Sequence, residues 1–170
     1  LSASPWTRGC VDLFEAGEHL VLGLSEAQRQ GLSPPYEVLD WTEPQGPYGL
    51  VFCGTNEECE ARAAMHPGSS WVGINSGQVV ERIAAWRAAQ IGVLYANRML
   101  GEGFDEPRCA SVWLAVESES EIRYVQTAGR ALRQRPDKVA RIYCATGTIK
   151  RRLTAALRRC DAWRALKAVS

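Results

Sequence analysis

The sequence predicts an α/β fold in which a mostly parallel sheet has helices on both faces. Two observations support this fold class. Short runs rich in β-branched and aromatic residues alternate with helix-like stretches, and most of these runs are nearly continuous in apolar residues, as strands covered on both faces require. A chain of 170 residues, 46% hydrophobic, is long enough to bury one core. The expected strands span 48–53, 70–74, 91–96, 110–116 and 139–144.

Two helix starts carry the pattern of a capping box, in which a hydroxyl and a carboxylate three residues later satisfy free amides. They are Thr55 with Glu58 and Ser118 with Glu121. A third helix is expected over 77–88, with Val80, Ile83, Ala84 and Ala88 facing inward.

A fourth helix is expected after Thr148, where apolar residues recur at helical spacing. Its inward stripe is Ile149, Leu153, Leu157, Cys160 and Trp163, and Arg151, Arg152, Arg158 and Arg159 lie largely off that stripe.

The first 47 residues differ from the rest because they contain five prolines and one weaker strand candidate, 36–41. We interpret residues 1–47 as an entry segment or interdomain connection and residues 48–170 as the folded domain. No run approaches the roughly 20 apolar residues of a membrane span, and no signal peptide is recognisable, so a cytoplasmic location is expected.

Charge is unevenly distributed along the chain. Residues 141–170 have a net charge of +7 and the first 140 residues have −6. The six cysteines form no C-x-x-C pair, so buried reduced thiols are expected, with no metal site and no disulfide framework. The basic end is suited to phosphates, although a solvated helix face is the commoner meaning of clustered arginines.

One segment combines residues suited to phosphate binding. Gln126, Gly129, Arg130 and Arg133 are spaced i, i+3, i+4, i+7 in the helix expected to begin near Ser118, so we expect them to share one face. Two guanidinium groups match the geometry of phosphate oxygens. A solvated basic face is the alternative for two arginines alone.

A glycine-rich stretch, 100–107, follows the strand 91–96. We expect it beyond the carboxyl ends of the strands, where open parallel sheets bind ligands. Gly103 allows a close backbone approach, and Asp105 is suited to accept a hydrogen bond from a ribose hydroxyl. A tight turn with a surface carboxylate is the alternative.

Together, the order and separation of E-G-F-D-x-P (102–107) and Q-x-x-G-R-x-x-R (126–133) resemble motifs V and VI of superfamily-two helicases. The resemblance implies a RecA-like fold for 48–170. It also implies that Gly103 and Asp105 touch the nucleotide. Arg130 and Arg133 are implied to reach the γ-phosphate as catalytic residues, with Gln126 and Gly129 beside them.

Weaker resemblances follow in family order. Residues 1–8 resemble motif III, which couples nucleotide state to nucleic-acid grip, and Ser2 and Ser4 are its hydroxyls. Residues 50–55 resemble motif IV, and Asn97 stands where motif V commonly has threonine. The residues implied to contact the nucleic-acid backbone are Gly54, Thr55, Asn75, Ser76 and Asn97.

The sequence lacks the lysine loop and acidic box, the Walker A and B motifs, with which such motors hold ATP and Mg²⁺. The resemblance implies that ATP and Mg²⁺ are held mainly by a first RecA-like domain, in the same longer polypeptide or in a separate chain. The function predicted is the second motor domain of an ATP-dependent helicase or translocase acting on nucleic acid, with DNA favoured over RNA.

Two other classes of protein remain as alternatives. One is a non-catalytic RecA-like adaptor that binds nucleic acid or protein. The other is a free-standing Rossmann-type enzyme, which is disfavoured because Gly101 and Gly103 are followed by Glu106 where a third glycine belongs.

Overall fold

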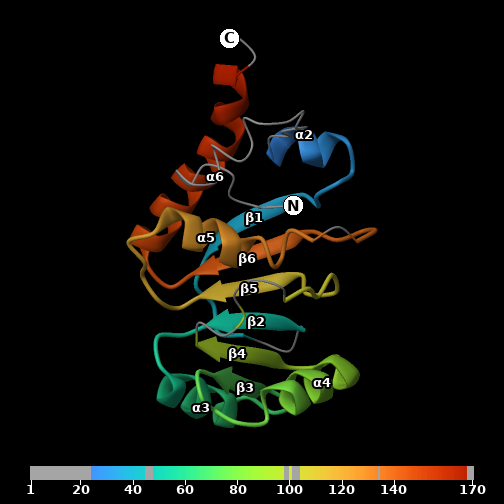
Figure 1. Cartoon of the computed structure of the whole chain (residues 1–170), viewed down its shortest axis with the longest axis vertical. Helices are drawn as coiled ribbons and strands as arrows, with labels where there is room; N and C mark the ends of the chain where they lie inside the picture. The colour runs from blue at the N-terminus through green and yellow to red at the C-terminus, as the bar shows by residue number, and fades with distance from the viewer. Residues whose placement is uncertain (1–23, 45–47, 98–99, 101–103, 134, 168–170) are drawn as a thin grey trace.

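The computed structural model describes residues 24–44, 48–97, 100, 104–133 and 135–167, the last eight of these as backbone alone. These residues form a six-stranded sheet in the order β1-β6-β5-β2-β4-β3, and every neighbouring pair is parallel. Figure 1 shows the sheet with the carboxyl ends of its strands on the left. The α/β fold class with a parallel sheet is confirmed.

Each expected strand is present, within a few residues of the expected bounds. The strands are β1 (Tyr36–Asp40), β2 (Gly49–Phe52), β3 (Ser70–Gly73), β4 (Val93–Asn97), β5 (Ser111–Leu114) and β6 (Ala140–Cys144). The helices are α2 (Leu24–Arg29), α3 (Asn56–Met65), α4 (Val79–Ala89), α5 (Glu121–Ala128) and α6 (Gly147–Lys167).

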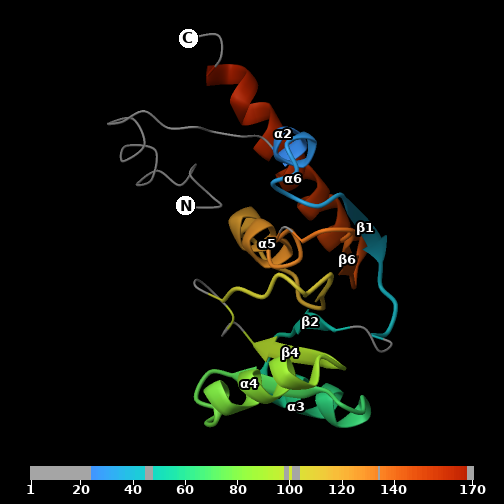
Figure 2. The ribbon, with the colours of Figure 1, turned by 90° about the vertical axis from the view of Figure 1, so that its right-hand side faces the viewer.

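Helices cover both faces of the sheet (Figure 2). Helices α4, α5 and α6 pack on one face around Trp86, Tyr124 and Leu153, and α3 packs on the other around Cys59, Tyr95 and Trp113. The central strands β4 and β5 are apolar except at Asn97 and Ser111, as strands with both faces buried require.

The strand β1 lies at one edge of the sheet and pairs with β6 from Tyr36 to Asp40. None of its residues is fully buried, and two of them, Glu37 and Asp40, are exposed, which explains why its apolar pattern is weaker than that of the central strands. Residues 24–44 thus contribute an edge strand and a short helix beside α6. The division of domains at residue 47 stays a prediction.

The helix starts agree with expectation in one case and differ in the other. Thr55 caps α3, since its side chain accepts a hydrogen bond from the Glu58 amide at 3.1 Å. In α5 the capping residue is Ser120 and not Ser118. The Ser118 side chain accepts from the Ser120 amide at 3.2 Å, which makes a turn there and delays the helix by two residues.

The expected inward face of α4 is confirmed at Ile83 and wrong at the other three residues. Val80 is 76% exposed, and Ala84 and Ala88 are also exposed. Ile83 faces the sheet together with Val79 and Trp86, at spacing i, i+4, i+7. The indole of Trp86 buries far more apolar area than an alanine methyl, and it stacks on Tyr48 with ring centroids 4.0 Å apart, so it sets the rotation of the helix.

The apolar stripe of α6 is confirmed for Ile149, Leu153 and Leu157, which are all buried. The side chains of Cys160 and Trp163 lie outside the described residues. Cys53, Cys59, Cys109 and Cys144 are buried free thiols, as expected. Within the described part of the chain, none of the helices is long and apolar enough to cross a membrane.

Candidate functional site

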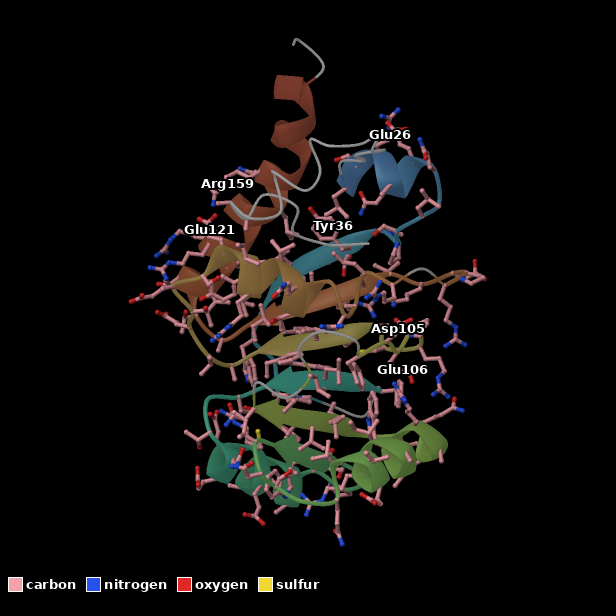
Figure 3. All side chains as sticks on the ribbon, in the orientation of Figure 1. Glu26, Tyr36, Asp105, Glu106, Glu121 and Arg159 are labelled. Carbon is pink, nitrogen blue, oxygen red and sulfur yellow. The ribbon has the colours of Figure 1, made fainter. Side chains whose placement is uncertain are left out.

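The segments 104–109 and 130–133 meet at the amino ends of the strands. Asp105 and Glu106 lie at the end opposite to the strand arrowheads, on the right in Figure 3. Residues 107–109 lead directly into β5, and Arg108 reaches Tyr48, the residue before β2. The expectation that Asp105 lies beyond the carboxyl ends is therefore wrong, because the chain has returned along the sheet to begin β5.

Both arginines of the second segment contact the first. Arg130 is 9% exposed and donates a hydrogen bond from Nη1 to the carbonyl of Phe104. Arg133 Nε lies 3.3 Å from Asp105 Oδ1, and both of these side chains are more than half exposed. The two motif-like segments therefore form one junction, although its two arginines differ in environment.

The prediction that Gln126, Gly129, Arg130 and Arg133 share one helical face is wrong. The helix ends at Ala128, and the following residues turn through i to i−3 hydrogen bonds such as Arg130 N to Thr127 O. Glycine is among the weakest helix formers, so Gly129 is a natural end point. Gln126 remains on α5, half-buried.

Gly129 occupies a crowded position at this helix end. Its amide donates to the Val125 carbonyl at 2.8 Å, and a Cβ placed on it would lie 3.0 Å from the same oxygen. Glycine is thus the residue that fits the turn leading to Arg130. Gly103, predicted to approach the nucleotide, lies outside the described residues.

Glu106 holds the first segment in place, and sequence analysis did not identify it as a site residue. Its carboxylate is 5% exposed and accepts from Arg108 Nε at 2.7 Å and Arg108 Nη2 at 2.9 Å. Arg87 Nε, from the end of α4, lies 3.3 Å away. The hydrogen bonds from Arg108 hold the pKa of Glu106 below its usual range.

Aromatic rings support the same segment. Phe104 packs beside Trp86, with centroids 6.4 Å apart, and the guanidinium of Arg87 lies over the Phe104 ring at 5.1 Å. Arg87 also donates to the Asp105 carbonyl at 2.8 Å. The backbone on either side of Asp105 is therefore fixed, while its carboxylate stays exposed to solvent.

The residues predicted to contact nucleic acid lie at the other end of the sheet. Gly54 and Thr55 follow β2, Asn75 and Ser76 follow β3, and Asn97 ends β4. These strands are neighbours in the order β2-β4-β3, and their carboxyl ends lie at the lower left of Figure 1. The structure therefore brings all five residues to the same end of the sheet.

Hydrogen bonds join these strand ends through Asn56, another residue that sequence analysis did not identify. Its side chain donates to the Ile74 carbonyl at 2.8 Å and accepts from Asn97 Nδ2 at 3.2 Å. The Gly54 amide donates to Glu58 Oε2 at 2.9 Å, so that amide is engaged in capping α3. Asn75 adopts a left-handed backbone (φ 60) and is exposed.

The described residues are better suited to contact a phosphate of ATP than to hold Mg²⁺. A half-exposed guanidinium on Arg133 is suited to a phosphate oxygen. In the described part of the chain, His, Cys, Asp and Glu side chains form no group of three that could hold a metal ion. Ser2 and Ser4, predicted to couple nucleotide to nucleic acid, lie outside the described residues.

Comparison with known proteins identifies the fold. No family model and no curated protein matches the sequence. A fragment assigned to the HsdR subunit of a type I restriction enzyme from Vibrio vulnificus matches with a TM-score of 0.67 at 17% identity, covering 86% of this chain and 38% of that one. An S. cerevisiae Dbp5 variant bound to RNA and ADP-BeF3 gives 0.61 at 14%, covering 92% and 47%.

The isolated C-terminal domain of the DEAD-box protein Dbp5 matches with a TM-score of 0.53 at 14% identity, covering 76% of this chain and 84% of that domain. The chain spans less than half of the longer structures and most of this single domain. The chain therefore has the RecA-like fold found in the C-terminal domain of superfamily-two helicases.

Proposed function

We propose that this chain is the second motor domain of an ATP-dependent helicase or translocase acting on nucleic acid. One observation carries the proposal: Arg130 and Arg133 both contact the segment that contains Asp105. Such a junction places a guanidinium and a carboxylate on one surface, where a nucleotide held by a first RecA-like domain meets them. The fold shared with the Dbp5 domain supports this arrangement.

The two arginines are proposed to act differently. Arg133, half-exposed, reaches the γ-phosphate and neutralises charge that develops on its oxygens in the transition state. Arg130 is 9% exposed and anchors the loop by its bond to Phe104. Gln126, Gly129 and Gly103 complete the nucleotide-facing set, and ATP and Mg²⁺ are held mainly by the first domain.

The nucleic-acid contacts are proposed for the carboxyl ends of β2, β4 and β3, at the end of the sheet opposite to Asp105. Gly54, Thr55, Asn75, Ser76 and Asn97 lie together there. The hydroxyls of Thr55 and Ser76 and the side-chain amides of Asn75 and Asn97 are suited to backbone phosphates, whereas the Gly54 amide already donates to Glu58 and would have to exchange that partner. DNA is favoured over RNA as the strand. Contacts of this kind do not read sequence, so the affinity is expected to fall steeply with salt.

The test is ATPase activity of the chain combined with a first RecA-like domain, with and without nucleic acid. Arg133→Ala is expected to lower kcat by about 100-fold or more, as loss of one transition-state donor does. Arg133→Lys should not restore it, because lysine lacks the planar fork. Arg141→Ala is the matched control, since Arg141 pairs with Glu37 on the edge of the sheet.

The arginine-finger assignment is wrong if Arg133→Ala leaves the stimulated rate intact, whatever Arg130→Ala does to the loop that Arg130 anchors. The second candidate, a non-catalytic adaptor, predicts nucleic-acid binding without stimulated hydrolysis. Fluorescence anisotropy with single-stranded DNA and single-stranded RNA of the same sequence compares the affinity of the chain for the two nucleic acids. Asn75→Asp, which adds a negative charge at the exposed turn, is expected to weaken binding to either.

A further inference from the structure

Lys138 lies outside every motif named above, in the chain between α5 and β6. Its ammonium group donates to the Pro107 carbonyl at 3.0 Å and to the Arg133 carbonyl at 2.8 Å. The residue is 8% exposed. One buried side chain thus bonds to the backbone of both segments of the junction.

The two carbonyls are well placed to control the exposed pair. Pro107 is two residues from Asp105, and the other carbonyl belongs to Arg133 itself. The Asp105–Arg133 ion pair is weak on its own, because both side chains are more than half exposed and water screens it. Its geometry must therefore come from the backbone beneath it, which Lys138 ties together.

Burying an ammonium group is costly unless its N–H groups find oxygens. Lys138 meets this condition through two backbone carbonyls, and it forms no ion pair with an acidic side chain among the residues that the structure describes. A methionine of similar length would fill the space without the hydrogen bonds. Lys138 therefore links two loops by hydrogen bonds, which a side chain that only fills the space would not do. We call this link the tie.

We propose that Lys138 is a positioning residue for the arginine finger, fixing the backbone of Pro107 and Arg133 so that Arg133 and Asp105 face the nucleotide in one geometry. The proposal rests on the proposed function for its effect on hydrolysis. The tie itself is a property of this chain alone, and it is tested separately below.

A titration gives the proposal a readout that packing lacks. Burial lowers the pKa of Lys138 to about 8, with Arg135 and Arg133 adding to the decrease and Cys109 and Glu106 opposing it. Above this pKa the neutral amine keeps two N–H groups, but its hydrogen bonds lose the assistance of charge. The tie is therefore expected to loosen as the pH rises through about 8.

Folding stability is expected to change in the opposite direction. The folded pKa of Lys138 lies below the unfolded value, about 10.4. Between these two values the unfolded state binds more protons, so the contribution of Lys138 to stability rises with pH. A fall in kcat over the same pH range is then not explained by loss of the fold.

The first experiment measures kcat and KM for ATP from pH 6.5 to 9.5, with a first RecA-like domain and saturating single-stranded DNA. Lys138→Met is expected to lower kcat by up to about 100-fold with KM within twofold, since a misplacement of about 1 Å of a catalytic group costs about 100-fold. Lys138→Arg should keep most of the rate and lose the fall above pH 8, because arginine stays protonated.

The control is Lys150→Met. Lys150 pairs with exposed Asp40, the last residue of the edge strand β1. It should match the wild type in rate and in pH profile. The proposal is overturned if Lys138→Met has the wild-type kcat, or if the alkaline fall persists in Lys138→Arg.

The second experiment uses the chain alone and needs no ATPase activity. Amide hydrogen exchange of residues 104–109 and 130–133 should be faster in Lys138→Met than in the wild type, with α3 and β4 unchanged. Equal exchange in these segments, or an equal increase throughout the chain, overturns the tie. Should Arg133→Ala leave hydrolysis intact while the local exchange rises as expected, the finger assignment fails and the tie stands.

Discussion

Glu106→Gln is a direct test of what holds the candidate site together. The substitution keeps the shape of the side chain and removes its negative charge. The carboxylate is 5% exposed and accepts three hydrogen bonds from Arg108, including one from the backbone amide at 3.2 Å. Arg87 approaches the same carboxylate at 3.3 Å.

The magnitude follows from the exposure of the partners. Hydrogen bonds to charged groups contribute about 1.5–3 kcal/mol each when their loss leaves a partner unsatisfied. Arg108 and Arg87 are 31% and 40% exposed, so water takes up part of the lost interaction. We expect Glu106→Gln to lower the free energy of unfolding by about 2 kcal/mol at pH 7, between the values for surface and buried pairs.

The pH dependence has a definite sign. The folded pKa of Glu106 lies below its unfolded value of about 4.3. Its contribution to stability is therefore fully present above about pH 4.3 and is lost as the pH falls through the folded pKa. The difference between wild type and Glu106→Gln should be constant from pH 7 to 5.5 and shrink below pH 4.

The assay is urea unfolding followed by tryptophan fluorescence, repeated at each pH. Glu37→Gln is the matched control, because Glu37 pairs with Arg141 at 3.4 Å and both side chains are about half exposed. It should change the free energy of unfolding by less than about 0.5 kcal/mol. A Glu106→Gln difference that is equally small, or that persists unchanged at low pH, would refute the reasoning.

Two other substitutions test the fold in the same assay. Thr55→Ala removes the cap of α3 and should lower the free energy of unfolding by about 1 kcal/mol, whereas Thr55→Ser should restore most of it. Trp86→Ala should cost about 3–5 kcal/mol because the indole is 2% exposed and stacks on Tyr48. Val80→Ala, at 76% exposure on the same helix, should change it by less than about 0.5 kcal/mol, and equal losses at the two positions would contradict the observed face of α4.

The strands could be predicted from sequence because burial on both faces leaves a simple trace, a continuous apolar run. The faces of α4 could not, because a stripe of Val80, Ala84 and Ala88 and a stripe containing Trp86 are both consistent with helical spacing. The choice between them depends on what the indole meets, and that is Tyr48, from a distant part of the chain.

The candidate site could also be predicted only in part from the sequence. The resemblance to two motifs assigned Asp105 and Arg133 separately to one nucleotide, and in the structure Arg133 Nε lies 3.3 Å from Asp105 Oδ1. Lys138 and Glu106 belong to no recognised pattern. The partners of Lys138 are backbone carbonyls, and those of Glu106 are Arg108 and, from α4, Arg87. A buried charge in a loop is visible only after the fold is known, although the sequence Glu106-Pro107-Arg108 placed opposite charges on either side of a proline.

The different surroundings of the two arginines bear on how the proposed motor would use them. Arg130 is buried and bonded to the Phe104 carbonyl, so moving it toward a phosphate would break a contact within the domain. Arg133 gives up only a solvent-screened pair with Asp105, which holds it weakly. A phosphate with higher charge competes well for that guanidinium. In the proposed motor, Arg133 is therefore the arginine that would change partners on closure of two domains, and its pair with Asp105 holds it at the surface of this chain.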